Sequence, residues 1–219
     1  LFNANATERM GNIEEGSTVT DFEAEEIERK SSLSSAMAFC DWKGHRLNII
    51  DTPGYINFIE DTKCSLSAVD GAVLIISAQS GIKAETGKLW QFADNYGIPR
   101  VIFVNKIDKD NVDFRSAVEG LEKAYSTPAI PLYIPKGADG RIDLMKMKAG
   151  KDGDETDIPD AFKDEAEEYR KNLTEKVAES DDELLEKYLE GNDLTDEEMN
   201  KAIKKGTIAG DFVPVVCGS

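Results

Sequence analysis

Three short apolar runs, separated by stretches of helical periodicity, constrain the fold of this chain more than any other feature. The runs are Leu47–Ile50, Ala72–Ile76 and Val101–Val104, all rich in β-branched residues. Such strands are typical of a parallel sheet that is buried on both faces. Between them, residues 56–69 and 82–97 carry apolar side chains at helical spacing. The order strand, helix, strand, helix, strand predicts a doubly wound α/β fold with right-handed crossovers.

Two further patterns extend this sheet. The segments 39–42 and 46–47 flank the dipeptide Lys43-Gly44, which predicts a hairpin and therefore one antiparallel edge strand in a mostly parallel sheet. Residues 212–216, with the sequence Phe-Val-Pro-Val-Val, predict a last strand that returns to the same sheet.

The acidic charge is concentrated in one segment. The chain has 219 residues with 43 acidic and 26 basic side chains, a net charge of −17. Residues 151–205 hold 20 of the acids and 9 of the bases, a net −11 that leaves −6 for the other 164 positions. This shift in composition predicts a small insert within the α/β fold.

The insert carries its own signals of secondary structure. Residues 131–134 and 142–145 predict strands on either side of a Gly-rich turn, and residues 148–154 predict a loop. Apolar side chains at steps of three and four predict a helix: Phe162, Ala166, Tyr169, Leu173 and Val177. Two capping boxes, Ser180 with Glu183 and Thr195 with Glu198, predict the starts of two more helices.

Composition excludes several classes of protein. The excess of acid argues against a protein that coats DNA, because phosphate contacts are made mainly by Lys and Arg. No run approaches 18 consecutive apolar residues, and no charged-then-apolar leader precedes the fold, so we expect neither a membrane span nor secretion. Cys40, Cys64 and Cys217 lie far apart, which predicts reduced thiols in the cytoplasm. The single histidine, His45, falls in the predicted hairpin turn, where we expect it to be solvated.

A first motif follows the strand that ends at Ile50. It consists of Asp51, Thr52, Pro53 and Gly54, at the carboxyl end of the strand, where ligands bind in open α/β sheets. A carboxylate in this place can hold Mg²⁺ through water, and the Gly54 N–H can approach a terminal phosphate because no Cβ intervenes. Taken alone, D-x-x-G is also a common turn.

A second motif follows the strand that ends at Val104. It consists of Asn105, Lys106, Ile107 and Asp108. The aspartate can accept two N–H bonds from a guanine edge, which adenine does not offer, and the stem of Lys106 can pack over the base. Because both motifs lie at strand ends and in this order, the pair predicts a guanine-nucleotide-binding domain.

The phosphate-cradling loop G-x-x-x-x-G-K-[ST] does not occur in the sequence. The nearest stretch, Gly81–Leu89, is one residue too long and ends in a leucine without a hydroxyl for Mg²⁺. We expect the loop upstream of Leu1, and we interpret the chain as a piece of a longer protein. On that interpretation the 219-residue piece has weak or no nucleotide affinity of its own, and no GTPase activity.

In these motifs and in the order of other segments, the chain resembles the nucleotide domain of bacterial elongation factor G, a translational GTPase. The resemblance covers essentially all of the chain and includes T-V-T-D at 18–21, W-K-G at 42–44, D-G-A-V at 70–73, A-E-S-D-D at 178–182 and P-V-V-C-G-S at 214–219. It implies a P-loop NTPase-like fold, binding of GTP or GDP with Mg²⁺, and GTP hydrolysis in ribosomal translocation. Asp51–Tyr55, Asn105–Asp108 and Ser219 would then be the nucleotide-binding residues.

The resemblance also implies an organisation and partners. Residues 1–130 are the GTP-binding domain without its phosphate loop, 131–210 the acidic insert, and 211–219 the return strand before the last guanine loop. The protein would be a cytoplasmic monomer that binds the ribosome through large-subunit RNA and the stalk protein, with no DNA or membrane partner. The stalk would contact acids of the insert such as Glu167, Glu168 and Glu175, for which a solvated helix surface is the plainer interpretation. The Tyr169 stripe has the plainer interpretation of core packing.

Two departures from the family pattern bear on the activity. Tyr55 stands where the family has a histidine that orients the attacking water, and a phenol with a reference pKa near ~10 is not a base at neutral pH. The first switch, which normally contains R-G-I-T-I, reads R-K-S-S-L here at Arg29–Leu33. Ser32 stands at the position of the threonine and keeps a hydroxyl for Mg²⁺. Tyr55 therefore indicates a divergent, second-copy branch, unless it simply fills space in a turn. Two alternatives stay open: a GTP-gated ribosome-binding factor with little or no hydrolysis, and a ribosome-protection protein of the tetracycline-resistance type.

Overall fold

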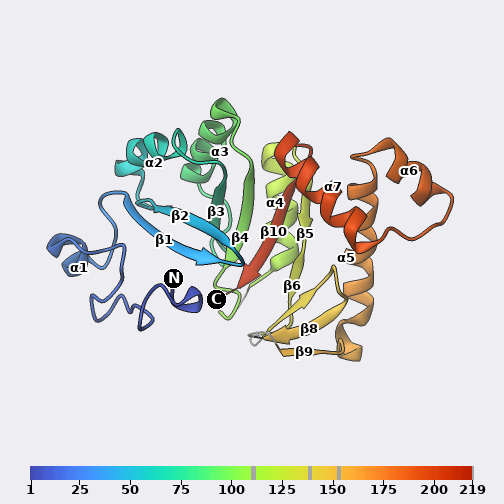
Figure 1. Ribbon diagram of the computed structural model, residues 1–219, viewed down its shortest axis with the longest axis horizontal. Coiled ribbons are helices and arrows are strands. Elements are labelled where there is room, and N and C mark those ends of the chain that lie inside the picture. The colour runs from blue at the N-terminus through green and yellow to red at the C-terminus, as the bar shows by residue number, and fades with distance from the viewer. Residues whose placement is uncertain (110–111, 138–139, 152–153, 219) are drawn as a thin grey trace. The chain divides into compact units, whose positions relative to one another are not determined.

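The structure, a computed structural model, describes residues 1–109, 112–137, 140–151 and 154–218. The chain separates into two compact units, Leu1–Val69 and Asp70–Ser219, which are described in turn (Figure 1). Within the described ranges, no helix is both long and apolar enough to cross a membrane.

The first unit is built around a β-hairpin. Its elements are the 3-10 helix η1 (Phe2–Ala4), α1 (Ala24–Arg29), β1 (Ala36–Trp42), β2 (His45–Asp51), η2 (Ile56–Phe58) and α2 (Ile59–Leu66). The hairpin turns at Lys43 and Gly44, with φ of 48° and 81°. Positive φ at both central residues matches the right-handed twist of the flanking strands, which confirms the predicted hairpin. His45 is exposed and pairs with Trp42.

The hairpin differs from the prediction in one respect. We expected its second strand to be buried within the main sheet, but β1 and β2 form a two-stranded sheet of their own. As a result Leu47 and Ile49 of β2 are 43% and 39% exposed. Val73 and Ile75 of the strand Ala72–Ser77 are likewise 64% and 63% exposed. The expected burial of these strands is therefore wrong, because among the described residues each is an edge strand with a partner on one side only.

The second unit contains the predicted parallel sheet. Its strands are β3 (Ala72–Ser77), β4 (Arg100–Asn105), β10 (Val213–Gly218) and β5 (Ala129–Pro131), in the order β3-β4-β10-β5 and all parallel. The helices α3 (Ala84–Tyr96) and α4 (Phe114–Tyr125) are the connections (Figure 1). The α/β fold, the parallel central sheet and the return strand after the acidic segment are confirmed.

The insert forms a second, antiparallel sheet and three helices. The strands are β6 (Tyr133–Pro135), β7 (Arg141–Asp143), β8 (Lys148–Lys151) and β9 (Asp154–Thr156), and the helices are α5 (Asp160–Ala178), α6 (Asp182–Leu189) and α7 (Asp196–Ala209). The prediction of a loop at 148–154 is wrong for 148–151, because β8 pairs with β7 and β9 on its two edges, and for Asp154, which begins β9; residues 152–153 of that prediction lie outside the described residues. The predicted strand 131–134 is divided between two sheets: Leu132 donates its N–H to Val215 of β10 and accepts from Leu144.

One of the two predicted capping boxes is present. The Thr195 hydroxyl accepts from the Glu198 N–H, and the Glu198 carboxylate accepts from the Thr195 N–H, at the start of α7. The box of Ser180 with Glu183 is wrong. The Ser180 hydroxyl instead donates to the Val177 carbonyl at the end of α5, so Asp181 takes the cap position of α6.

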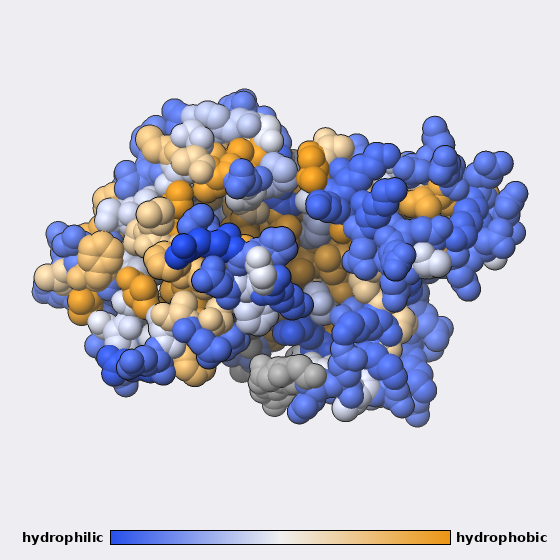
Figure 2. Space-filling model, in the orientation of Figure 1, coloured by the Kyte–Doolittle hydropathy of each residue, from blue (hydrophilic) through white to orange (hydrophobic). Residues whose placement is uncertain are grey.

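A continuous core joins the insert to the parallel sheet within the second unit. Ile102 and Val215 of the sheet are fully buried in one cluster with Leu144, Leu173 and Met199 of the insert. In the predicted apolar stripe of α5, Ala166, Tyr169, Leu173 and Val177 are buried and Phe162 packs at the edge. The outer surface of α6 and α7 is predominantly hydrophilic (Figure 2). The boundaries at 130/131 and 210/211 stay a prediction.

Candidate functional site

The guanine motif lies on the loop that follows β4, at the carboxyl end of the parallel sheet. Asn105 is the last residue of the strand, and its carbonyl accepts from the Ala78 N–H at 2.9 Å. Its side-chain oxygen accepts from the Lys106 N–H at 2.8 Å. Lys106 has a φ of 64°, in the left-handed region that non-glycine residues seldom adopt. The Asn105 side chain therefore holds the sharp backbone turn from which the rest of the motif projects.

The same loop is fixed to the end of β10. Gly218 is in register with Asn105, and the Gly218 carbonyl accepts from the Ile107 N–H at 3.4 Å. A Cβ on Gly218 would lie 2.8 Å from Cζ of Phe103, so glycine allows this close approach. Ile107 is buried in the core. Two strand ends that are more than a hundred residues apart in sequence thus meet at one edge, where open α/β sheets bind their ligands.

The two side chains expected to read the base are exposed. Lys106 and Asp108 both face solvent, and the Asp108 carboxylate contacts Lys109 Nζ at 3.2 Å. An exposed ion pair of this kind contributes about 0–1 kcal/mol, so a ligand can displace it at little cost. Ser219, which was also predicted to contact the nucleotide, lies outside the described residues.

The phosphate motif of the first unit begins where β2 ends. Asp51 is exposed, whereas Pro53 is buried and its carbonyl accepts from the Thr62 hydroxyl of α2 at 3.5 Å. A Cβ built on Gly54 meets no atom within 4 Å. The space where a side chain would stand on Gly54 is therefore open, on the side of the residue that a Cβ would otherwise occupy.

Tyr55 follows this motif and starts the next helical turn. Its carbonyl accepts from the Phe58 N–H at 3.0 Å, which begins η2, and its side chain is 61% exposed. A phenol with this exposure packs little of its surface against the described protein and is free to donate a hydrogen bond to a ligand. Thr52, the remaining residue of the motif, is half-buried.

Ser32 of the first switch is held by an aspartate that the sequence analysis did not single out. The Ser32 hydroxyl donates to Asp21 Oδ1 at 2.6 Å, and the Thr18 hydroxyl lies 3.4 Å from Asp21 Oδ2. The T-V-T-D segment was noticed only as part of a resemblance. The signal for this contact is weak, because the two residues are eleven positions apart in irregular chain.

Glu26 of α1 was also missed. Its side chain is only 1% exposed, and its carboxylate accepts from the N–H groups of Leu33 at 2.9 Å, Ser34 at 3.2 Å and Glu23 at 3.2 Å. The bond from Leu33 is the main cause that lowers the Glu26 pKa, against the opposing effect of burial. The sequence signal was its place three residues after Glu23, where a capping box has its second carboxylate.

The oxygen donors present in the first unit fit a magnesium ion. Ser32 uses its hydroxyl proton toward Asp21 and keeps its lone pairs, and Asp51 presents an exposed carboxylate. No group of three or more His, Cys, Asp or Glu side chains is placed to hold a metal within the described ranges. Mg²⁺ commonly takes one or two protein oxygens and completes its shell with water and substrate phosphates.

Comparison with known proteins agrees with this geometry. Residues 1–219 match the family model of the elongation factor Tu GTP-binding domain. The chain is also similar to a protein of solved crystal structure from Thermus thermophilus, with 32% identity and a TM-score of 0.91. That match covers all of this chain and 34% of the Thermus chain, so the present chain spans about a third of that protein's length. The chain belongs to the elongation factor Tu GTP-binding domain family, the GTP-binding domain of translational GTPases.

Proposed function

We propose that this chain is the nucleotide-binding part of an elongation factor G-like protein that hydrolyses GTP on the ribosome during translocation. The observation that carries the proposal is the loop after β4, in which Asn105 and Gly218 fix the backbone and leave Asp108 exposed. In this role Asp108 accepts two N–H bonds from guanine and Lys106 packs its stem over the base. Ser219 follows Gly218 directly and would contact the same base.

The phosphates would lie against the motif that follows β2. The Gly54 N–H donates to the terminal phosphate, since no Cβ intervenes on this residue. Mg²⁺, when bound, neutralises the charge that develops on the phosphates. Ser32 would hold the ion through its hydroxyl, and Asp51 through water. The terminal phosphate would order residues 18–35 and 51–55, and its loss would release them.

Tyr55 decides how fast the reaction runs. Phosphoryl transfer depends mainly on positioning and electrostatics, so a phenol that orients the attacking water by a hydrogen bond supports slower hydrolysis than a histidine does. The acidic surface of α5 to α7 would face the ribosomal stalk, as the resemblance to elongation factor G suggests. A GTP-gated binder that hardly hydrolyses is the second candidate, and Tyr55 is the specific observation in its favour. A ribosome-protection protein is a third candidate, decided by the other domains of the complete protein.

The test is multiple-turnover GTP hydrolysis by the complete protein with and without ribosomes, for wild type, Tyr55→His and Tyr96→His. Tyr96, at the end of α3, is an exposed tyrosine outside every motif and serves as the matched control. We expect ribosome-stimulated turnover by wild type and the control, and faster turnover by Tyr55→His. A silent wild type with an active Tyr55→His variant would replace the GTPase by the GTP-gated binder. If no variant hydrolyses GTP, the proposed activity is wrong.

A further inference from the structure

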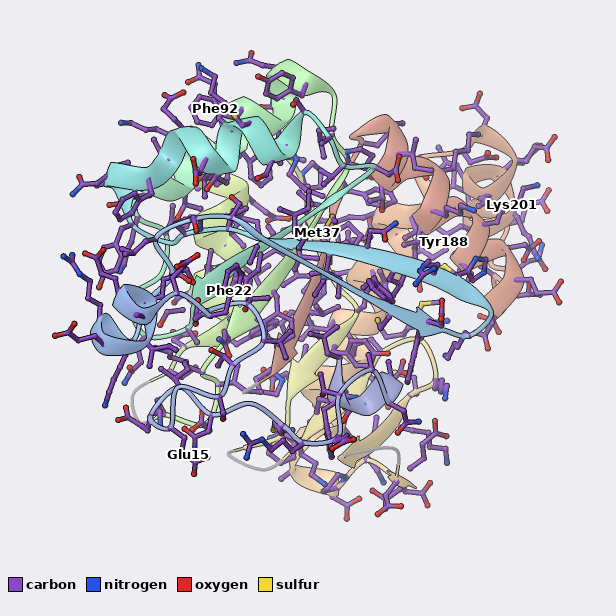
Figure 3. All side chains as sticks on the ribbon, turned by 60° about the vertical axis from the view of Figure 1, so that its left-hand side comes forward. Glu15, Phe22, Met37, Phe92, Tyr188 and Lys201 are labelled. Atoms are coloured by element: carbon purple, nitrogen blue, oxygen red, sulfur yellow. The ribbon has the colours of Figure 1, made fainter. Side chains whose placement is uncertain are left out.

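Glu26 contacts the first switch on both sides of Ser32. Its main-chain carbonyl accepts from the Lys30 N–H, which ends α1, and from the Ser31 N–H at 3.1 Å. Its carboxylate accepts from the N–H groups of Leu33 and Ser34. One residue therefore holds the backbone of four of the five positions 30–34, and the position between the two pairs is Ser32. Figure 3 shows the side chains of this region, with Phe22 labelled two residues before α1.

We propose that Glu26 is the positioning residue of the first switch, which fixes the backbone around Ser32 so that its hydroxyl is presented to the metal and nucleotide. The proposal rests on the function proposed above. The contact is made to backbone N–H groups, so it does not depend on which side chains stand at positions 31–34. That property suits this chain, because the segment that reads R-G-I-T-I in the family reads R-K-S-S-L here, at Arg29–Leu33.

Besides its bonds to Leu33 and Ser34, the carboxylate accepts from the Glu23 N–H at the start of its own helix. It is 1% exposed on a helix whose other acids, Glu25 and Glu28, face solvent. Glu25 forms an exposed ion pair with Arg29 at 2.7 Å, one turn along the helix. Burying a carboxylate is costly unless it is well hydrogen-bonded. Here the switch segment supplies two of the three backbone N–H bonds and Glu23 supplies the third, so the carboxylate and the segment hold each other in place.

The hydroxyl of Ser32 completes the arrangement. The hydroxyl donates to Asp21, and this hydrogen bond orients its lone pairs, while Glu26 fixes the backbone on either side of Ser32. A second-sphere hydrogen bond of this sort orients a metal ligand. The Ser34 hydroxyl, 3.5 Å from the same Glu26 oxygen, adds a weaker contact.

The test combines residue-resolved amide hydrogen exchange with nucleotide titrations of the complete protein. In wild type we expect the amides of Ser31, Leu33 and Ser34 to be protected relative to that of Ser32. In Glu26→Gln, the side-chain oxygen that accepts from Leu33 and Ser34 becomes a neutral acceptor, so exchange at these two amides should rise by about fivefold, the difference between a hydrogen bond to a charged group and one to a neutral group. Glu28→Gln, the same change at an exposed site of the same helix, should leave the pattern unchanged.

The functional readout is the Mg²⁺ concentration that gives half-maximal GTP binding. We expect Glu26→Gln to raise this Mg²⁺ concentration about fivefold, because the bonds to Leu33 and Ser34 weaken to neutral ones, and to leave the affinity for GDP without Mg²⁺ unchanged. A merely structural role would weaken both kinds of binding. Glu26→Asp keeps the charge but is one methylene shorter, and it provides an intermediate variant if Glu26→Gln does not fold.

The outcomes separate this inference from the proposed function. Unprotected amides at Leu33 and Ser34 in wild type would overturn the contact itself, whatever the variants do. An unchanged Mg²⁺ dependence in a folded Glu26→Gln protein would overturn the positioning role while GTP binding stands. If wild type binds no GTP, the proposed function fails and the positioning role fails with it, although the exchange pattern still shows whether Glu26 holds the segment.

Discussion

The packing of α7 against the start of β10 gives a prediction in which two physical effects have opposite signs. Gly206 lies inside α7, where alanine is the better helix former by about 1 kcal/mol. A Cβ at this position, however, would lie 2.5 Å from Cζ and 2.6 Å from Cε1 of Phe212. Phe212 is 2% exposed and lies in the core.

We therefore expect Gly206→Ala to destabilise the protein. Overpacking a filled core costs about 1–3 kcal/mol, and a contact this short with a fully buried ring places the cost in the upper half of that range. After the gain in helix propensity, the net loss is about 1–2 kcal/mol. For a chain of this size that loss lowers the midpoint of thermal unfolding by about 3–6 °C.

The matched control is Gly120→Ala in α4. The nearest atom to a Cβ there is Cδ1 of Ile82 at 3.8 Å, an ordinary contact, so only the gain in propensity remains. We expect this variant to be more stable by up to about 1 kcal/mol. In the double variant Gly206→Ala with Phe212→Leu, the alanine should cost less than it does alone, because the ring atoms it meets are gone. The reasoning is refuted if urea unfolding shows Gly206→Ala to be as stabilising as Gly120→Ala.

Three further predictions concern the insert and the guanine loop. Leu173→Ala, at a position 1% exposed in α5, should lower the free energy of unfolding by about 2–5 kcal/mol, and a urea-measured loss below ~1 kcal/mol would contradict the shared core. Lys187 Nζ, at 2.8 and 2.9 Å from the two oxygens, is the main cause that lowers the pKa of Glu198 from 4.5 to about 2. The Lys187–Glu198 pair therefore contributes its full share of the free energy of unfolding above pH 4.5 and loses it as the pH falls toward 2. The thermal midpoints of wild type and Glu198→Gln should converge between these two pH values. A difference that stays constant with pH would disprove the contribution of the ion pair. Asp108→Ala should weaken GTP and GDP binding to the complete protein by about tenfold or more in fluorescence titrations, and equal affinity would remove Asp108 from the base site.

The sequence predicted those parts of the fold whose signal is local. The apolar stripe of α5 was visible because burial repeats with the helical period, and Ala166, Leu173 and Val177 are all buried. The hairpin was visible because Lys43-Gly44 accepts positive φ at both positions. The parallel strands β3 and β4 were recognised by continuous β-branched runs, although the similar run in β2 gave no indication that, among the described residues, this strand pairs only with β1 and antiparallel.

The misses have a common physical cause, which is competition settled by distant partners. Ser180 and Asp181 both favour a helix N-cap, and Asp181 takes the role because the Val177 carbonyl engages the serine. Residues 148–151 look like a loop by composition and become a strand because β7 and β9 pair with both edges. The strand β5 is three residues long and exists through its pairing with β10, more than eighty positions away.

The same distinction between local and non-local signals separates the candidate site residues that were predicted from those that were missed. The motif residues at 51–54 and 105–108 were found from their position at strand ends, which is a local signal, whereas Tyr55 was singled out only through the resemblance. Asp21 and Glu26 were missed because each acts on residues that an irregular chain brings back to it. Nothing in an acidic helix marks one carboxylate as buried, and burial is what gives Glu26 its role.

The guanine loop of the second unit and the first switch of the first unit are held by different kinds of contact. The guanine loop is fixed by strand register, by the Asn105 side chain within the loop and by the buried Ile107, all of which belong to the core of the second unit. The first switch is held by the carboxylates of Asp21 and Glu26, with little apolar burial of its own. Segments with few buried apolar contacts open at low free energy, whereas core strands open only with the whole unit. On the proposed function, addition of nucleotide to the complete protein should therefore change amide exchange at Leu33 far more than at Ile107.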